Sequence, residues 1–241
     1  MKSLAAAVTF LTRFPLGRLV RFDAADVARS AGWFPLVGLL IGAICCGAAF
    51  VLRGHLPSAL VAVILVALDA LLTGALHFDG LADTADGFGG GKDREDVLRI
   101  MRDHAIGSYG GTALVLLVAL KVAAYSVLLS GQRWWAAILF TPAVGRWSIL
   151  LLTAALPYAR QTASVVRDMG KGSLIWGTLT LAVALTASRL WCAGAAAGSA
   201  IVVSTCWGFY CRRKIGGITG DTLGANVQLC ECAALVVFLW V

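Results

Sequence analysis

Charged residues are scarce in this chain of 241 residues, since Asp, Glu, Lys and Arg together make up 14%. An average soluble domain carries about 25%. Hydrophobic residues reach 59%, which is more apolar surface than a soluble protein of this size can bury in its core. The same composition excludes a disordered chain, a collagen-like chain and a coiled coil. We therefore expect an all-α integral membrane protein.

Histidine is also rare, with three residues in the chain, and none of the seven cysteines forms a C-x-x-C pair. A structural zinc or iron–sulfur site is therefore not expected, and the cysteines are expected to be reduced, buried thiols. A Ser/His/Asp or Cys/His nucleophile arrangement is absent as well. The chemistry of this chain has to come from its acidic and basic side chains.

Lys and Arg exceed Asp and Glu by seven charges. In a membrane protein such an excess is typical of cytoplasmic loops, which hold positive charge during insertion and against anionic lipid. We therefore expect no nucleic-acid partner.

Seven segments are apolar enough to be considered as spanning helices of about 20 residues, although one of them is short. They lie at residues 32–52, 58–76, 111–130, 134–156, 173–187, 190–210 and 221–241, of which 173–187 is the short one. Residues 3–20 mix apolar runs with arginine, which suits a helix lying in the membrane interface. The whole chain, 1–241, is then one membrane-embedded domain built as a polytopic helix bundle.

The connections between these segments carry very unequal charge. Alternate connections hold 15 Lys and Arg on one side of the membrane and 3 on the other. This bias predicts seven spans with a cytoplasmic N-terminus. It also places the long loop 77–110 and the turn 211–220 on the same, cytoplasmic, face.

Seven of the thirteen acidic residues fall between Asp79 and Asp103. Asp79, Asp83 and Asp86 are spaced i, i+4, i+7, so on a helix they share one face. Three neighbouring carboxylates repel one another unless a cation joins them, and hard oxygen ligands suit Mg²⁺ or Mn²⁺. The spacing favours a metal site; the alternative is a solvated acidic helix end.

A second motif, KIGGITGD at 214–221, opens the last predicted span. Its glycines, Thr219 and Asp221 would also suit a helix cap. Its predicted position on the same side of the membrane as the Asp cluster favours a shared site.

Four ionisable residues fall inside predicted spans, where charge is costly and usually faces an interior site or an opposite charge. Among them Arg146 is our expected diphosphate contact. For Asp69 and Lys121, mutual pairing is as good an interpretation as function, and Glu231 lies about three turns into the last span.

Taken together, the motifs resemble the cobalamin synthase family, whose members are adenosylcobinamide-GDP ribazoletransferases. The likeness extends over nearly the whole chain. One departure is His104, where we expect a small hydroxyl residue. The stretches that carry the resemblance are FLTRFP at 10–15, FPLVGLLIGA at 34–43, HFDGLADTADGF at 77–88, REDVLRIMRDHAIGSYG at 94–110, PAVGRW at 142–147 and KIGGITGDTLGA at 214–225.

The resemblance implies an enzyme of the bacterial inner membrane that depends on Mg²⁺. It would transfer phosphoadenosylcobinamide from adenosylcobinamide-GDP to α-ribazole, or to its 5′-phosphate, and release GMP. It leaves open a homo-oligomer or a complex with other proteins of cobalamin assembly.

Under this resemblance the two motifs take specific roles. Asp79, Asp83 and Asp86 would hold Mg²⁺ against the diphosphate, with Asp103 or Asp221 completing the site, and Asp86 would accept the hydroxyl proton. The expected phosphate contacts are Arg94, Arg146, Lys214, Thr219 and Gly220.

Three other functions remain as alternatives. A CDP-alcohol phosphotransferase would show D-x-x-D-G-x-x-A-R, whereas this chain reads DGLADTADG. A cation transporter would spread its acids through several spans at mid-depth. A scaffold for corrinoid assembly would not need the Asp cluster.

Overall fold

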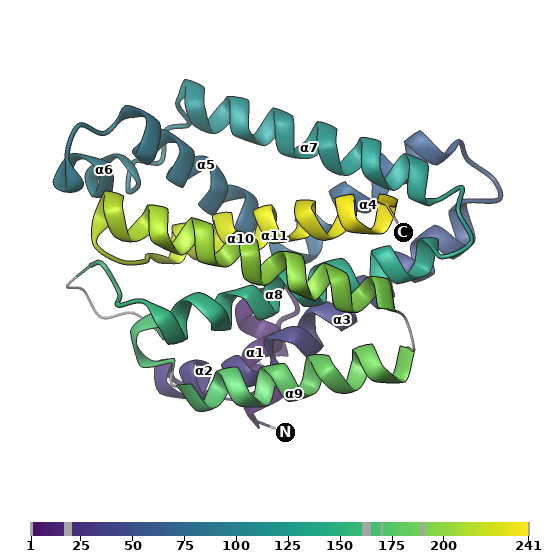
Figure 1. The fold of residues 1–241 in the computed structure, drawn as a ribbon, viewed down its shortest axis with the longest axis horizontal. Helices are drawn as coiled ribbons and strands as arrows, with labels where there is room; N and C mark the ends of the chain where they lie inside the picture. The colour runs from purple at the N-terminus through teal and green to yellow at the C-terminus, as the bar shows by residue number, and fades with distance from the viewer. Residues whose placement is uncertain (1, 17–20, 161–164, 170, 189–190, 241) are drawn as a thin grey trace.

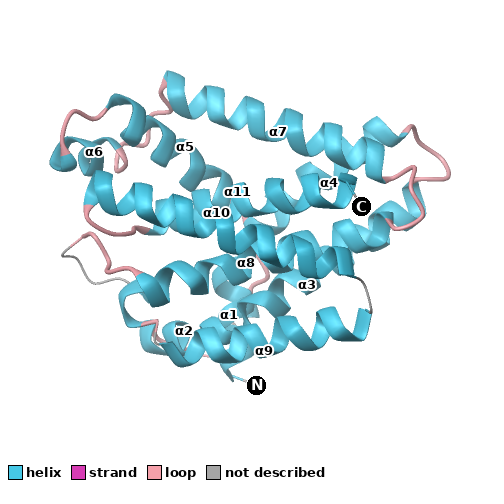
Figure 2. Cartoon of the chain, in the orientation of Figure 1, coloured by secondary structure: helices cyan, strands magenta, loops and turns pink. Residues whose placement is uncertain are grey.

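The computed structural model describes residues 2–16, 21–160, 165–169, 171–188 and 191–240. These residues are mostly helical, joined by loops, and they contain no strand, only one isolated bridge (Figure 2). The expected all-α helix bundle is confirmed. The α-helices are α1 (Lys2–Leu11), α2 (Ala24–Arg29), α3 (Phe34–Leu52), α4 (Ser58–Thr73), α5 (Leu76–Gly90), α6 (Arg94–Ile100), α7 (Ser108–Leu128), α8 (Trp134–Ala155), α9 (Lys171–Ser188), α10 (Trp191–Ile215) and α11 (Gly220–Trp240), and the 3₁₀ helices are η2 (Ala31–Trp33) and η3 (Val165–Asp168).

In the part of the chain that the structure describes, five helices are long and apolar enough to cross a membrane, so the chain is a multi-pass membrane protein. They are α3 with its preceding turn, α7, α8, α10 and α11, and their bounds lie close to those expected from hydropathy. The count rises to six if α4 and α5 form one bent span. The expected count of seven is not confirmed.

The difference arises first at α4. This helix does not lead into a loop; it is followed by α5, turned by 91°. The bend falls at Gly74 and Ala75, which both adopt positive φ, of 63° and 60°. Such a conformation is unfavourable for alanine, so the surrounding contacts must hold it in place. The first part of the segment expected as the loop 77–110 is therefore a helix packed inside the molecule.

The second difference is α9, whose apolar part covers only Gly172–Thr186. A backbone bridge between Tyr158 and Ile218 joins the connection after α8 to the turn after α10. Both connections therefore lie at one end of the bundle, and the 25-residue α10 reaches the other end over about 37 Å. Helix α9 runs beside α8 and α3 between the two ends (Figure 1).

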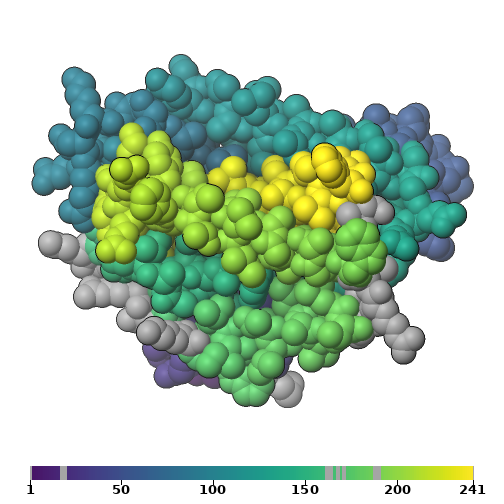
Figure 3. All heavy atoms as spheres, in the orientation of Figure 1, coloured from purple at the N-terminus to yellow at the C-terminus, as the bar shows by residue number. Residues whose placement is uncertain are grey.

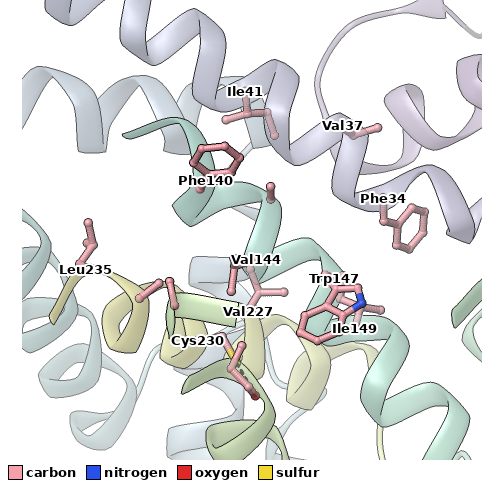
Figure 4. Close-up of a cluster of buried hydrophobic side chains, with 14 of the residues drawn as sticks. Phe34, Val37, Ile41, Phe140, Val144, Trp147, Ile149, Val227, Cys230 and Leu235 are labelled. Carbon is pink, nitrogen blue, oxygen red and sulfur yellow. Dashed lines mark hydrogen bonds between the residues drawn. The ribbon is translucent and has the colours of Figure 1, made fainter. Parts of the chain in front are cut away.

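Helix α8 lies at the centre and is buried along most of its length. Two glycines of α3, Gly38 and Gly42, bring the two backbones together, because a Cβ at either position would meet α8 main-chain atoms. Figure 4 shows the apolar side chains that α8 packs between α3 and α11, namely Phe34, Val37 and Ile41 of α3, Phe140, Val144, Trp147 and Ile149 of α8, and Val227, Cys230 and Leu235 of α11.

The space-filling view shows these helices closely packed along the bundle (Figure 3). All seven cysteines are free thiols, and four of them are buried as expected. Cys206 of α10 is exposed, which differs from that expectation and fits the lipid-facing side of a spanning helix.

Four charged side chains meet inside the bundle, one each from α4, α7, α8 and α11. The Lys121 ammonium lies 2.5 Å from a Glu231 oxygen and 3.5 Å from an Asp69 oxygen. Arg146 pairs with the same two acids. Two positive and two negative charges cancel, and all four residues are buried. We call this group the ion cluster.

A further close contact joins α5 to α11. A Cβ at Gly80 would lie 2.8 Å from the main-chain oxygen of Asp221, and a Cβ at Gly224 would lie 3.3 Å from Cα of Gly80. Glycine on both helices allows this approach, as is common where helices pack in lipid.

Breaking the ion cluster should destabilise the protein. In the Lys121→Met variant Arg146 alone faces both acids, so one buried negative charge is uncompensated. Loss of one member of a buried ion pair costs about 3–5 kcal/mol. Adding Glu231→Gln restores neutrality and should recover much of that loss. SDS-induced unfolding in mixed micelles measures the difference, with the exposed Arg102→Met as the control. Equal stability of Lys121→Met and wild type would contradict a structural role for the cluster.

The Gly80→Val variant should force α5 away from α11, since its side chain would overlap the α11 backbone. Overpacking of this kind costs about 1–3 kcal/mol. The matched control is Gly47→Val on α3, where a Cβ meets nothing within 4 Å. Thermal unfolding of both variants in detergent compares them, and equal melting temperatures would refute the close contact.

Candidate active site

The two acidic motifs meet where α5 crosses the first turn of α11. Asp79 and Asp83 stand one turn apart on α5, and Asp221 lies in the first turn of α11. The Gly80 contact with the Asp221 backbone brings the two helices together at this point. The site lies toward the end of the bundle where α6 and the turn between α10 and α11 are found (Figure 1). Residues about 140 positions apart in sequence are thus neighbours.

Negative charge exceeds positive charge here. The Asp83 carboxylate experiences like-charge repulsion from Asp79, Asp221 and Asp86, and attraction from Arg160. Nη2 of Arg160 donates a hydrogen bond of 2.9 Å to Asp221. The side chains of Asp79 and Asp83 have no hydrogen bond or ion pair with any of the described residues. Two carboxylates of the site are therefore free to bind a cation.

Arg160 was not singled out by the sequence, because it stands alone in a connection without a motif. Its position is fixed by the bridge between the two connections, in which Ala159 N–H donates to Ile218 at 2.7 Å and Ile218 N–H donates to Pro157 at 3.0 Å. Pairing of Arg160 with Asp221 depends on this bridge. Only the three-dimensional structure could have found it.

A three-carboxylate metal cage is not present in this arrangement. Among the described residues no group of three or more His, Cys, Asp and Glu side chains is placed to hold a metal ion. Mg²⁺ usually takes one or two carboxylates and completes its shell with water and substrate phosphates. The free carboxylates of Asp79 and Asp83 fit such an ion, shared with a phosphate ligand.

Asp86 has another partner. Its two carboxylate oxygens accept hydrogen bonds of 2.8 Å from the N–H groups of Gly107 and Gly110, at the start of α7. A carboxylate is favourable at a helix N-terminus, and a Cβ on either glycine would collide with it. Asp86 therefore fastens α5 to α7, and its predicted roles as metal ligand and base gain no support from this geometry.

Asp103 and Arg94 lie on the segment that joins α5 to α7. Asp103 is exposed and accepts a hydrogen bond from the N–H of Ala105; in the described residues nothing links it to Asp79 or Asp83. Arg94 donates to the carbonyls of Ile215 and Ala159, at 2.8 and 2.7 Å. It braces the backbone near the site.

The rest of α6 presents the solvated face expected from its spacing. Its N-cap is Asp93, which accepts a hydrogen bond from the N–H of Asp96. The Arg99 guanidinium beside Asp96 lowers the pKa of that carboxyl. This exposed pair does not belong to the site.

The second motif forms the start of α11. The Thr219 hydroxyl accepts from the N–H of Thr222, which makes Thr219 the cap of this helix. Lys214 donates to the carbonyl of Phe88 at 3.1 Å, near the C-terminal end of α5. Gly220 is exposed, and a Cβ there would meet nothing within 4 Å. Among the phosphate contacts expected in this motif, Gly220 therefore has open space around it, whereas Thr219 and Lys214 already bond to other groups of the protein.

Arg146 does not face the acidic site. Its guanidinium is fully buried in the ion cluster, where it pairs with Asp69 and Glu231. The expected contact between Arg146 and a diphosphate is therefore not supported, because its charge is already balanced. The alternative interpretation of mutual pairing for Asp69 and Lys121 agrees with the structure.

Comparison with known proteins gives a consistent result. The family model described as cobalamin-5-phosphate synthase matches residues 3–239. A protein of Rhizobium etli named adenosylcobinamide-GDP ribazoletransferase is 40% identical, over 96% of this chain and 94% of its own. One of the same name from Klebsiella pneumoniae is 38% identical, over 99% of this chain and all of its own. The comparison with solved structures found no match.

These matches extend over nearly the full length of both chains and include both acidic motifs. The chain belongs to the cobalamin-5-phosphate synthase family.

Proposed function

We propose that this protein is a Mg²⁺-dependent adenosylcobinamide-GDP ribazoletransferase. Its relatives carry that name at 38–40% identity. The structural observation that carries the proposal is that Asp79 and Asp83, which are unpaired among the described residues, lie beside the Asp221–Arg160 pair. Free carboxylates and one arginine at the end of a membrane bundle suit the transfer of a phosphate-linked group.

In the proposed reaction the 5′-hydroxyl oxygen of α-ribazole attacks the phosphorus that bears adenosylcobinamide. A new P–O bond forms, the bond from that phosphorus to the bridging oxygen breaks, and GMP leaves with the electron pair. The hydroxyl proton passes to a free carboxylate, for which Asp79 and Asp83 are the candidates. Arg160 stabilises the negative charge that develops on the phosphate oxygens.

Mg²⁺ bound by Asp79 and Asp83 would neutralise the diphosphate as GMP departs. The protein's own residues set the positions of the groups. Asp221 keeps the Arg160 guanidinium at the edge of the site through its hydrogen bond. Asp86 keeps the acidic face of α5 in place by holding the start of α7.

We also propose that the site faces the cytoplasm from the bacterial inner membrane. Residues 77–110, 157–172 and 211–220 carry ten Lys and Arg against three in the connections expected on the other side, which supports this orientation. The bridge between Tyr158 and Ile218 is in agreement, since it places two of those connections at one end. Adenosylcobinamide-GDP and α-ribazole would then both arrive from the cytoplasm.

The alternative functions are not favoured. A cation transporter needs acids available along a path, whereas the acids Asp69 and Glu231 are neutralised by Lys121 and Arg146. The free carboxylates instead gather at one end.

The Asp83→Asn variant should lower the rates of GMP release and of cobalamin formation together, by about a hundredfold or more. The amide keeps the shape of the side chain but removes the charge that a metal ion and a developing proton need. The control is Glu95→Gln, an exposed acid on α6. Both products are followed by chromatography with the protein in lipid nanodiscs, and a fully active Asp83→Asn would rule out the site.

Removal of divalent cations should stop turnover. We expect EDTA to abolish product formation and excess Mg²⁺ to restore it. The free carboxylates and the diphosphate are both negatively charged, so a cation is needed between them. The stability of the protein in EDTA, measured by thermal unfolding, serves as the control. Undiminished turnover in EDTA would exclude the proposed metal dependence.

A further inference from the structure

A cavity of about 590 Å³ lies beside the acidic site, and Arg160, which is hydrogen-bonded to Asp221, is part of its lining. Its walls come from the end of α8, the connection after it and the turn before α11. The volume falls within the range of about 300–1,000 Å³ that is typical of small-molecule sites. None of the roles assigned above uses this space.

Two arginines line the cavity, and Arg160 has more hydrogen-bond donors to spare than Arg94. A guanidinium presents five N–H donors in a planar fork, and one of its nitrogens, Nη2, is bonded to Asp221. Its Nε is buried and has no hydrogen-bond partner among the residues that the structure describes. Arg94 also lines the cavity, but two of its nitrogens are bonded to carbonyls of the backbone. An anion in the cavity would therefore pair with Arg160.

Polar atoms make up the larger part of the exposed lining, and the apolar side chains in it are those of Leu156, Pro157, Val166 and Ile218, with the ring of Tyr158 beside them. The backbone bridge through Tyr158 and Ile218 makes this part of the wall rigid. A cationic edge, a mixed polar and apolar lining and an aromatic ring match a phosphate ester that carries a flat heterocycle with polar edges. Inorganic phosphate would leave most of the volume unfilled.

We infer that this cavity binds the nucleoside 5′-monophosphate part of the activated substrate, with the phosphate on Arg160 and the base between the apolar walls. The inference rests on the proposed function and specifies which side of the site the leaving group occupies. Asp221 then marks the boundary between the nucleotide and the carboxylates of α5. The diphosphate bridge lies at this boundary, where the bond has to break.

The test is equilibrium binding of radiolabelled GMP to the full chain in phosphatidylcholine nanodiscs with Mg²⁺. The Arg160→Gln variant should weaken GMP binding roughly ten- to a hundredfold. The Arg99→Gln variant makes the same charge change at an exposed pair and should bind like wild type. Ribose 5-phosphate and inorganic phosphate should compete at least about tenfold less well than GMP, since they lack the base.

A second variant keeps the arginine and fills the space. Thr153 lines the cavity from α8, so Thr153→Trp should exclude GMP by volume while the Asp221–Arg160 pair persists. This variant decides the matter if Arg160→Gln fails to fold. Unchanged GMP binding in either folded variant, or equal competition by inorganic phosphate, would overturn the assignment.

Turnover in the same preparation separates this inference from the proposed function. If both hold, Arg160→Gln raises the KM for adenosylcobinamide-GDP and leaves the KM for α-ribazole unchanged. If the protein is active but the Arg160→Gln variant binds GMP as tightly as wild type, the cavity assignment alone is refuted. Protein that binds GMP through Arg160 but forms no cobalamin would refute the transferase and leave a nucleotide site.

Discussion

The arrangement of this bundle depends on a neutral ion cluster in its interior. Asp69, Lys121, Arg146 and Glu231 belong to four different helices, and each of the two basic side chains pairs with both acids. In lipid an unpaired charge is costly, so each helix must present its residue at the same depth. The cluster therefore fixes the relative register of α4, α7, α8 and α11 more strictly than apolar packing alone would.

The ion cluster also influences the position of the acidic site, because one of its members lies on α4, the helix that precedes α5. Asp69 lies one turn before the end of α4, and the chain then bends by 91° into α5. Two contacts fix the direction of α5: the glycine contact of Gly80 with α11, and the hydrogen bonds of Asp86 to the start of α7. Both of these neighbouring helices carry members of the ion cluster. The position of the carboxylates in the acidic site therefore depends on the same helix packing that holds the ion cluster together.

Much of this could be predicted from the sequence, because hydropathy and helical spacing are local signals. The bounds of the long apolar helices and the shared face of Asp79 and Asp83 are of this kind. The bend at Ala75 could not be predicted, since an alanine gives no signal for positive φ. The roles of Arg160 and Asp86 depend on contacts 61 and 21 residues away in sequence, which no local pattern contains. Prediction from sequence has the same limit at Arg146. An arginine inside the membrane is expected to have a partner, but the sequence does not show which residue that partner is.

We propose that carboxylates from α5 and α11, far apart in sequence, form a single cation-dependent site. To test this, Mn²⁺ binding to the purified protein in nanodiscs is measured by electron paramagnetic resonance, with adenosylcobinamide-GDP present and α-ribazole absent. We expect Asp83→Asn and Asp221→Asn each to weaken Mn²⁺ binding by at least about tenfold relative to wild type. If Asp221→Asn bound Mn²⁺ as tightly as wild type, the two motifs would not share one site.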